Sequence, residues 1–197
     1  MKIMQIKHTF IAFAASAALL LGTANINRAH AAQYTLDPTH SFVQFSIAHL
    51  GYSLLQGRFN TLSGSFSYDP KQPNAARIAV EVETASIDSN HAERDKHLRG
   101  ADFLDVENYP KARFVSSAIH EANGKATVRG DLTLHGVTRP VRFEAELIGA
   151  GKDPWGGYRR GYKGSLTIKR ADFGVSYNLG PAAETMRLDL FIEGIRQ

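Results

Sequence analysis

The polar side chains best suited to chemistry gather in one stretch near the middle of the chain, where His91, Arg94, Asp95 and His97 lie close together. Imidazole and carboxylate groups serve as general acids and bases. A guanidinium binds a phosphate or quinone head group through paired hydrogen bonds. The competing interpretation is a network that only fixes this stretch to the fold, with Arg94 paired to Asp95 or Asp102.

The segment that carries these residues, 86–109, holds six acidic and three basic side chains. We expect a short helix over residues 90–98, with Asp88 or Ser89 as the N-cap that accepts a hydrogen bond from a free backbone amide. Pro110 ends the segment. Because alternating apolar residues flank the segment on both sides, this helix is expected to plug or cover a β structure.

The histidines of the chain match no metal-binding or catalytic motif. His91 and His97 are not separated by the i, i+4 spacing of helical zinc ligands, so we predict no metal site. His49 ends a strand-like run, where it either contacts a ligand head group or completes a buried turn. The chain has no cysteine and no G-x-S-x-G, P-loop or G-x-G-x-x-G motif, and we expect no cofactor.

The first residues of the chain are typical of an export signal. Lys2 and Lys7 precede an apolar run over residues 10–21, and Ala-His-Ala at residues 29–31 provides the small residues of a cleavage site. The apolar run is shorter than the ~20 residues that span a bilayer. We therefore expect a signal peptide over residues 1–31, cleavage after Ala31, and a periplasmic domain over residues 32–197.

The positive charge of the chain belongs mostly to this export signal. Residues 1–31 hold Lys2, Lys7 and Arg28 and no acid, so their removal lowers the formal net charge from +4 to about +1. A nucleic-acid-binding protein needs a basic face on the folded domain. We therefore expect no nucleic-acid partner.

The rest of the chain alternates between apolar and polar residues, with turn residues between the runs. This pattern predicts antiparallel strands. Asn123-Gly124 is a strong hairpin signal, because both residues tolerate positive φ. About eight strands closing on themselves give a barrel whose interior holds side chains or one small ligand. The fold class is therefore an all-β antiparallel eight-stranded barrel with one short inserted helix, and the expected strands cover residues 41–49, 54–68, 77–84, 113–120, 126–134, 141–148, 162–168 and 186–192.

Several sequence blocks resemble the YceI-like family. They include HSFVQFSIAHLGYS from His40, SIDSNHAERDKHLRGADFLD from Ser86, GDLTLHGVTRPV from Gly130 and DPWGGYRRGY from Asp153. The resemblance covers nearly all of the expected domain. It implies a lipocalin-like barrel whose apolar tunnel holds an isoprenoid or other long-chain lipid, with no known catalytic activity.

Candidate ligand-binding residues combine the inward-facing apolar side chains with the polar groups nearest the expected tunnel mouth. They are Val43, Phe45, Ile47, His49, Ile78, Val80, Val82, Arg94, His97, Leu132, Leu134, Phe143, Leu166 and Leu188.

Two other functions remain open at this point. One is an enzyme that acts on a lipid head group through His49, His91, Asp95 and His97, although no enzyme activity is expected from the resemblance. The other is a structural barrel with a filled core. The aromatic residues around Trp155 either make a transient membrane contact or cap one barrel end, and the protein is expected to be a monomer or homodimer.

Overall fold

The structure is a computed structural model that describes residues 31–197. The expected signal peptide lies outside the described residues, apart from Ala31. Within the described part of the chain, no helix is long and apolar enough to cross a membrane.

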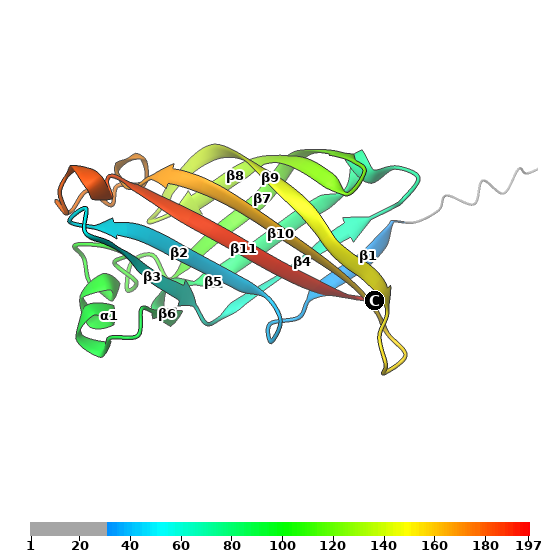
Figure 1. The fold of residues 1–197 in the computed structure, drawn as a ribbon, viewed down its shortest axis with the longest axis horizontal. Helices are drawn as coiled ribbons and strands as arrows, with labels where there is room; N and C mark the ends of the chain where they lie inside the picture. Colours follow the sequence, from blue (N-terminus) through cyan, green and yellow to red (C-terminus); the bar gives the residue numbers. More distant parts are fainter. Residues whose placement is uncertain (1–30) are drawn as a thin grey trace, which may run out of the picture.

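A closed antiparallel barrel forms the body of the molecule (Figure 1). Its eight strands follow the order β1, β4, β5, β7, β8, β9, β10 and β11, and β1 closes the ring by pairing with β11. The predicted fold class is confirmed. The strand bounds are β1 (Ala32–Leu36), β2 (Phe42–His49), β3 (Ser53–Phe59), β4 (Leu62–Tyr68), β5 (Arg77–Glu83), β6 (Ile87–Asp88), β7 (Lys111–Ala122), β8 (Lys125–Leu134), β9 (Val137–Lys152), β10 (Tyr158–Lys169) and β11 (Thr185–Arg196).

The three remaining strands extend the sheet beside β11. One end of β11 pairs with β1, and its other part pairs with β2, which continues through β3 to β6. The prediction of a single strand over residues 54–68 is therefore wrong. Asn60 and Thr61 separate β3 from β4, because β3 pairs with β2 while β4 pairs with β1 and β5.

Two tight hairpins fix the register of the long strands. Asn123 and Gly124 have φ angles of 54° and 76°, and His135 and Gly136 have 50° and 72°. Left-handed conformations at both central residues match the twist of antiparallel strands. The predicted Asn123-Gly124 hairpin is confirmed, and it joins β7 to β8 with Ala122 opposite Lys125.

The predicted helix is present as α1 (Ala92–Arg99), close to the expected range. Its N-cap is His91, whose Nδ1 accepts a hydrogen bond from the backbone amide of Arg94, so the expectation of Asp88 or Ser89 is wrong. After α1, Leu104 packs into the main hydrophobic core. This segment covers the barrel end that lies opposite the C-terminus in Figure 1. The 3₁₀ helices are η1 (Pro73–Ala75), η2 (Thr84–Ser86), η3 (Arg170–Phe173) and η4 (Pro181–Ala183).

Candidate functional site

The barrel encloses a cavity of about 190 Å³ whose wall is almost entirely apolar. Inward-facing side chains from both halves of the barrel line it, because alternate residues of each strand point to the same face. On β11 the lining runs from Met186 to Ile192, about 20 Å along the strand at ~3.3 Å per residue. The cavity is therefore elongated, and its chemistry is that of a hydrocarbon site.

Most of the apolar residues predicted to bind a ligand lie on this wall. These are Val43, Ile78, Val80, Val82, Leu132, Leu134, Phe143, Leu166 and Leu188. Sequence reasoning did not single out Phe59, Phe66, Leu104, Ile119 and Val128, which also line the cavity. Phe66 and Val128 lie in runs that alternate like the others, and this alternation is the signal that identifies them.

Three candidates on β2 lie elsewhere. Phe45 is buried, but its ring packs against Gly57 on the neighbouring strand rather than on the cavity wall. Ile47 is buried between Met186 and Leu55, its partners on β11 and β3. His49 is exposed at the end of β2, so the alternative in which it completes a buried turn is wrong, and it does not line the cavity.

The polar residues of α1 stabilise their own segment and do not line the cavity. Arg94 donates from Nε to the hydroxyl of Ser89 and from Nη2 to its carbonyl oxygen, at 2.7 and 2.6 Å. The buried carboxylate of Asp95 accepts hydrogen bonds from the backbone amide and hydroxyl of Ser89. The interpretation as a fixing network agrees with these contacts, but the expected pairing of Arg94 with Asp95 or Asp102 is wrong.

His97 also lies away from the cavity. Its Nε2 is 3.1 Å from Oδ2 of Asp102, and its ring makes edge contacts with Phe103 and Tyr177. Both members of the His97–Asp102 pair are exposed. The structure therefore does not bring Arg94 and His97 together with the apolar candidates.

A polar cluster that the sequence reasoning missed lies inside the barrel, consisting of Tyr68, Glu121, Arg160 and Tyr162. Arg160 is only 8% exposed, and its guanidinium carbon lies 3.5 Å from the centre of the Tyr68 ring. Arg160 Nε donates to the hydroxyl of Tyr162, and Nη2 lies 3.8 Å from Oε1 of Glu121. The hydroxyl of Tyr68 donates to the same Glu121 oxygen at 3.2 Å.

Three members of the polar cluster, Tyr68, Glu121 and Tyr162, line the cavity, whereas Arg160 does not. Burial raises the pKa of Tyr162 to about 12, so its hydroxyl stays protonated at neutral pH. Arg160 and Tyr162 are two residues apart on β10, and strand alternation puts both inside. This alternation is the sequence signal for the cluster. Tyr162, one of the aromatic residues around Trp155 considered for a membrane contact, therefore lines the cavity instead, whereas Trp155 is 79% exposed.

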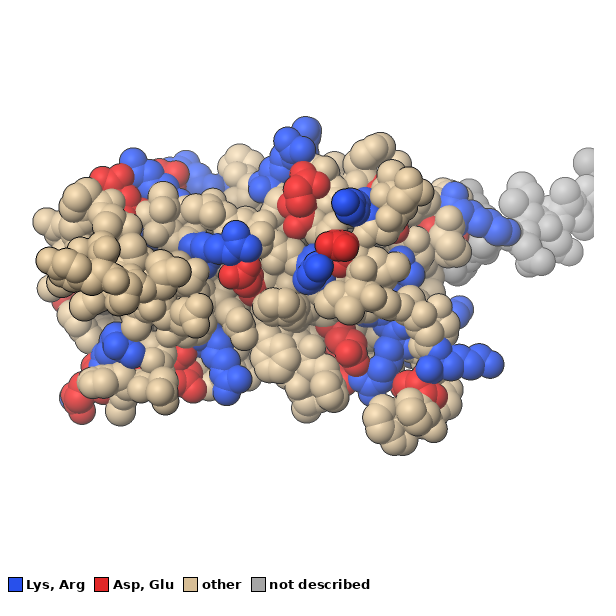
Figure 2. Space-filling view, in the orientation of Figure 1, with Lys and Arg blue, Asp and Glu red and all other residues tan. Residues whose placement is uncertain are grey.

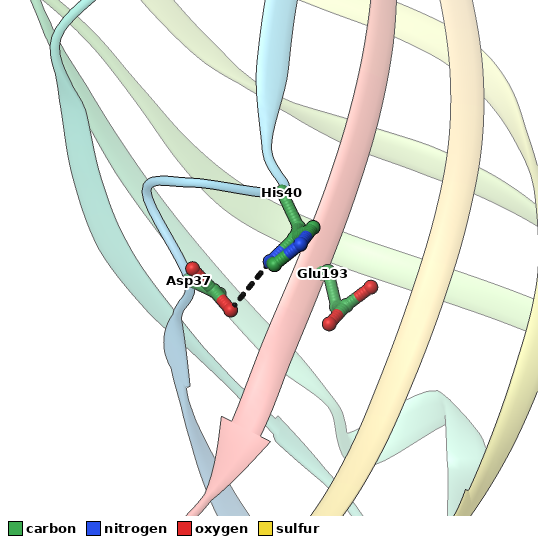
Figure 3. Close-up of side chains that lie close together, drawn as sticks. All are labelled: Asp37, His40 and Glu193. Carbon is green, nitrogen blue, oxygen red and sulfur yellow. Dashed lines mark hydrogen bonds and ion pairs between the residues drawn. The ribbon is translucent and has the colours of Figure 1, made fainter. Parts of the chain in front are cut away.

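A second polar group, on another part of the barrel, consists of Asp37, His40 and Glu193 (Figure 3). Their ligand atoms lie within 4.8 Å of one another. Arg159 already occupies the position of a cation, since Nη1 lies 2.6 Å from Asp37 Oδ2 and 2.5 Å from Glu193 Oε1. Hydrogen bonds from Thr39, His40 and Arg159 hold the pKa of Asp37 well below its usual range. This group is therefore a structural ion network rather than a metal site.

Comparison with known proteins identifies the family. A family model described as a YceI-like domain matches residues 34–193. The chain belongs to the YceI-like family. One relative is the UPF0312 protein PA0423 of Pseudomonas aeruginosa, 51% identical over 185 residues that cover 92% of this chain and 97% of the relative. The UPF0312 protein of Ectopseudomonas mendocina is 52% identical over 187 residues, which are 93% and 98% of the two chains.

Solved structures agree with the YceI-like fold. BcnA of Burkholderia cenocepacia aligns with a TM-score of 0.71 and 25% identity, over 80% of this chain and 98% of BcnA. A polyisoprenoid-binding domain from Saccharophagus degradans aligns with a TM-score of 0.64 over 83% of this chain and 98% of that domain. Because this domain is only 19% identical to the chain, the similarity between them shows a shared fold and nothing further.

Proposed function

We propose that this YceI-like protein binds an isoprenoid or other long-chain lipid in the barrel cavity and acts as its carrier, store or scavenger in the periplasm. The elongated apolar cavity carries this proposal. A few polar side chains on the cavity wall are shielded from solvent, and they lie near one end of the cavity. Most of a bound molecule would therefore contact apolar side chains. A lipid chain has this character along its whole length.

The energetics of such a site favour a long chain over a short one. Each buried CH₂ contributes about 0.8 kcal/mol, and association costs about 4–15 kcal/mol. About a dozen buried methylene groups offset the whole of the association cost at the low end of this range and only part of it at the high end. Useful affinity therefore needs a chain long enough to fill the cavity.

Export to the periplasm fits the position of the first strand. The proposed cleavage follows Ala31, and β1 begins at Ala32, where Ala32 pairs with Tyr68 of β4. The barrel thus begins where the proposed signal peptide ends. Removal of residues 1–31 would leave every strand of the barrel intact.

Transient membrane contact is assigned to the turn between β2 and β3. Leu50 and Tyr52 on this turn are 62% and 87% exposed, and Leu54 at the start of β3 is 66% exposed. The turn lies at the end of the barrel opposite the C-terminus (Figure 1). On the face shown in Figure 2, the central part of that end carries no Lys, Arg, Asp or Glu. Exposed apolar and aromatic side chains of this kind suit the boundary between lipid head groups and acyl chains.

The enzyme alternative finds no support in the positions of its proposed residues. His91 caps α1, Asp95 binds Ser89 and His97 contacts Asp102, while His49 is exposed on β2. A general acid and base must converge on one substrate position. His91, Asp95 and His97 instead have separate structural partners, and none of the four residues lines the cavity.

Substitutions on the two faces of adjacent strands test the proposal. Val80 of β5 lines the cavity, whereas Val115 of β7 faces outward and is 37% exposed. Val80→Phe should weaken the binding of a fluorescent long-chain lipid at least tenfold by occupying its space, and Val115→Phe should leave the binding unchanged. Equal binding by both variants, or no saturable binding by the unmodified protein, would refute the proposal.

A further inference from the structure

The polar cluster at one end of the apolar cavity has a chemistry that the hydrocarbon wall does not explain. Burying a charged group is costly unless it is paired and hydrogen-bonded. Here Arg160 is balanced by Glu121 and covered by the ring of Tyr68. A purely apolar ligand could form no hydrogen bond with these polar groups on the cavity wall.

One donor and one acceptor on residues that line the cavity have no partner within the cluster. Tyr68 directs its hydroxyl hydrogen to Oε1 of Glu121. The oxygen of Tyr162 accepts from Arg160, so its own hydrogen remains available. Among the described residues, Oε2 of Glu121 has no hydrogen-bond partner, so this carboxylate keeps acceptor capacity.

We propose that the polar cluster binds an uncharged, hydroxyl-bearing end of the lipid, such as the end of a long-chain alcohol or phenol. The ligand hydroxyl donates to Glu121 and accepts from Tyr162. This inference rests on the proposed function, since it requires that a lipid chain fills the cavity. It specifies the class of lipid.

The charge of the cluster disfavours a phosphate at the same position. Arg160 lies behind the wall and its charge is already balanced by Glu121, which itself faces the cavity. A phosphate dianion has no hydrogen to donate to this carboxylate and would be repelled by it. Prenyl phosphates and diphosphates should therefore bind more weakly than the corresponding alcohol.

The test compares three ligands that share one prenyl chain and end in a hydroxyl, a phosphate or no oxygen. Binding of the hydrocarbon alone measures the proposed function, and the ratios between ligands measure the cluster. The purified, delipidated protein should bind the alcohol about tenfold more tightly than the hydrocarbon. It should also bind the alcohol at least tenfold more tightly than the phosphate.

Two variants assign these preferences to individual side chains. Tyr162→Phe keeps the ring and should remove most of the preference for alcohol over hydrocarbon, whereas Tyr158→Phe, at a position on the same strand that does not line the cavity, should leave it intact. Glu121→Gln removes the negative charge and should narrow the ratio of alcohol to phosphate binding about tenfold.

The outcomes separate the inference from the proposed function. Failure to bind any of the three ligands would refute lipid binding itself. Tight hydrocarbon binding with no preference for the alcohol, or tighter binding of the phosphate, would overturn only the role of the cluster. Unchanged ratios in Tyr162→Phe would overturn it as well, even if Glu121→Gln fails to fold.

Discussion

The ring of Phe45 lies over the backbone of Gly57, its cross-strand partner between β2 and β3. A Cβ atom at Gly57 would collide with this ring and lie 2.8 Å from the carbonyl oxygen of Asp88 on β6. The glycine thus lets three strands pack closely where an aromatic ring covers it. The same contact explains why Phe45 is buried without lining the cavity.

Gly57→Ala should lower the free energy of unfolding by about 1–3 kcal/mol, because the added methyl group overpacks the site. Gly151→Ala is the control, since a Cβ at Gly151 of β9 would meet no atom within 4 Å. Its effect should stay within about 1 kcal/mol in either direction. Urea unfolding of both variants measures the difference, and equal stabilities would show that the contact with Phe45 does not constrain this position.

Arg159→Met should destabilise the protein because it leaves the buried carboxylate of Asp37 without its cation. Arg142→Met is the matched control, since its pair with Glu144 is exposed on both sides. Exposed pairs of this kind contribute at most about 1 kcal/mol. Thermal or urea unfolding should show a loss several times larger for Arg159→Met, and losses of the same size would contradict a structural role for this network.

The low pKa of Asp37 predicts acid sensitivity. Since the folded-state pKa lies below the unfolded value of about 3.9, the stabilisation is complete above the unfolded value and is lost progressively as the pH falls from there toward the lower folded-state pKa. The stability difference between the unmodified protein and Asp37→Asn should therefore shrink as the pH falls from about 5 to about 3. Unfolding curves across this range test it, and a constant difference would show that Asp37 contributes nothing through its charge.

Leu54→Glu should reduce binding to lipid vesicles without changing the affinity of the cavity for its ligand, because it places a charge at the exposed start of β3, next to the turn between β2 and β3. Ile148→Glu provides the control, as Ile148 is similarly exposed on β9. Co-sedimentation with vesicles measures the contact. If both variants sediment like the unmodified protein, the turn does not contact the membrane.

Strand alternation made most of the fold and the cavity wall predictable from the sequence. The inward positions of Ile78, Val80 and Val82 on β5 follow directly from the period of two. The break between β3 and β4 did not follow, because it depends on which distant strands each half pairs with. Phe59 and Leu62 are both buried but lie three residues apart, so the period of two changes phase at the break.

The polar residues were harder to predict than the apolar ones. Arg94 and His97 attracted attention because charges are dense around them, but their partners are local to α1. Arg160 and Tyr162 meet Tyr68 and Glu121, which come from β4 and β7. Such a cluster forms only when the barrel closes, so its members are far apart in the sequence and their partners cannot be identified from spacing.

The most direct test of lipid binding is the mass of the protein purified from the periplasm without detergent, measured under native and denaturing conditions. The native mass should exceed the denatured mass, and the difference should extract into organic solvent as a long-chain lipid with an uncharged polar end. Equal masses, together with no uptake of a prenyl chain when one is offered, would contradict the account and indicate a filled, structural barrel.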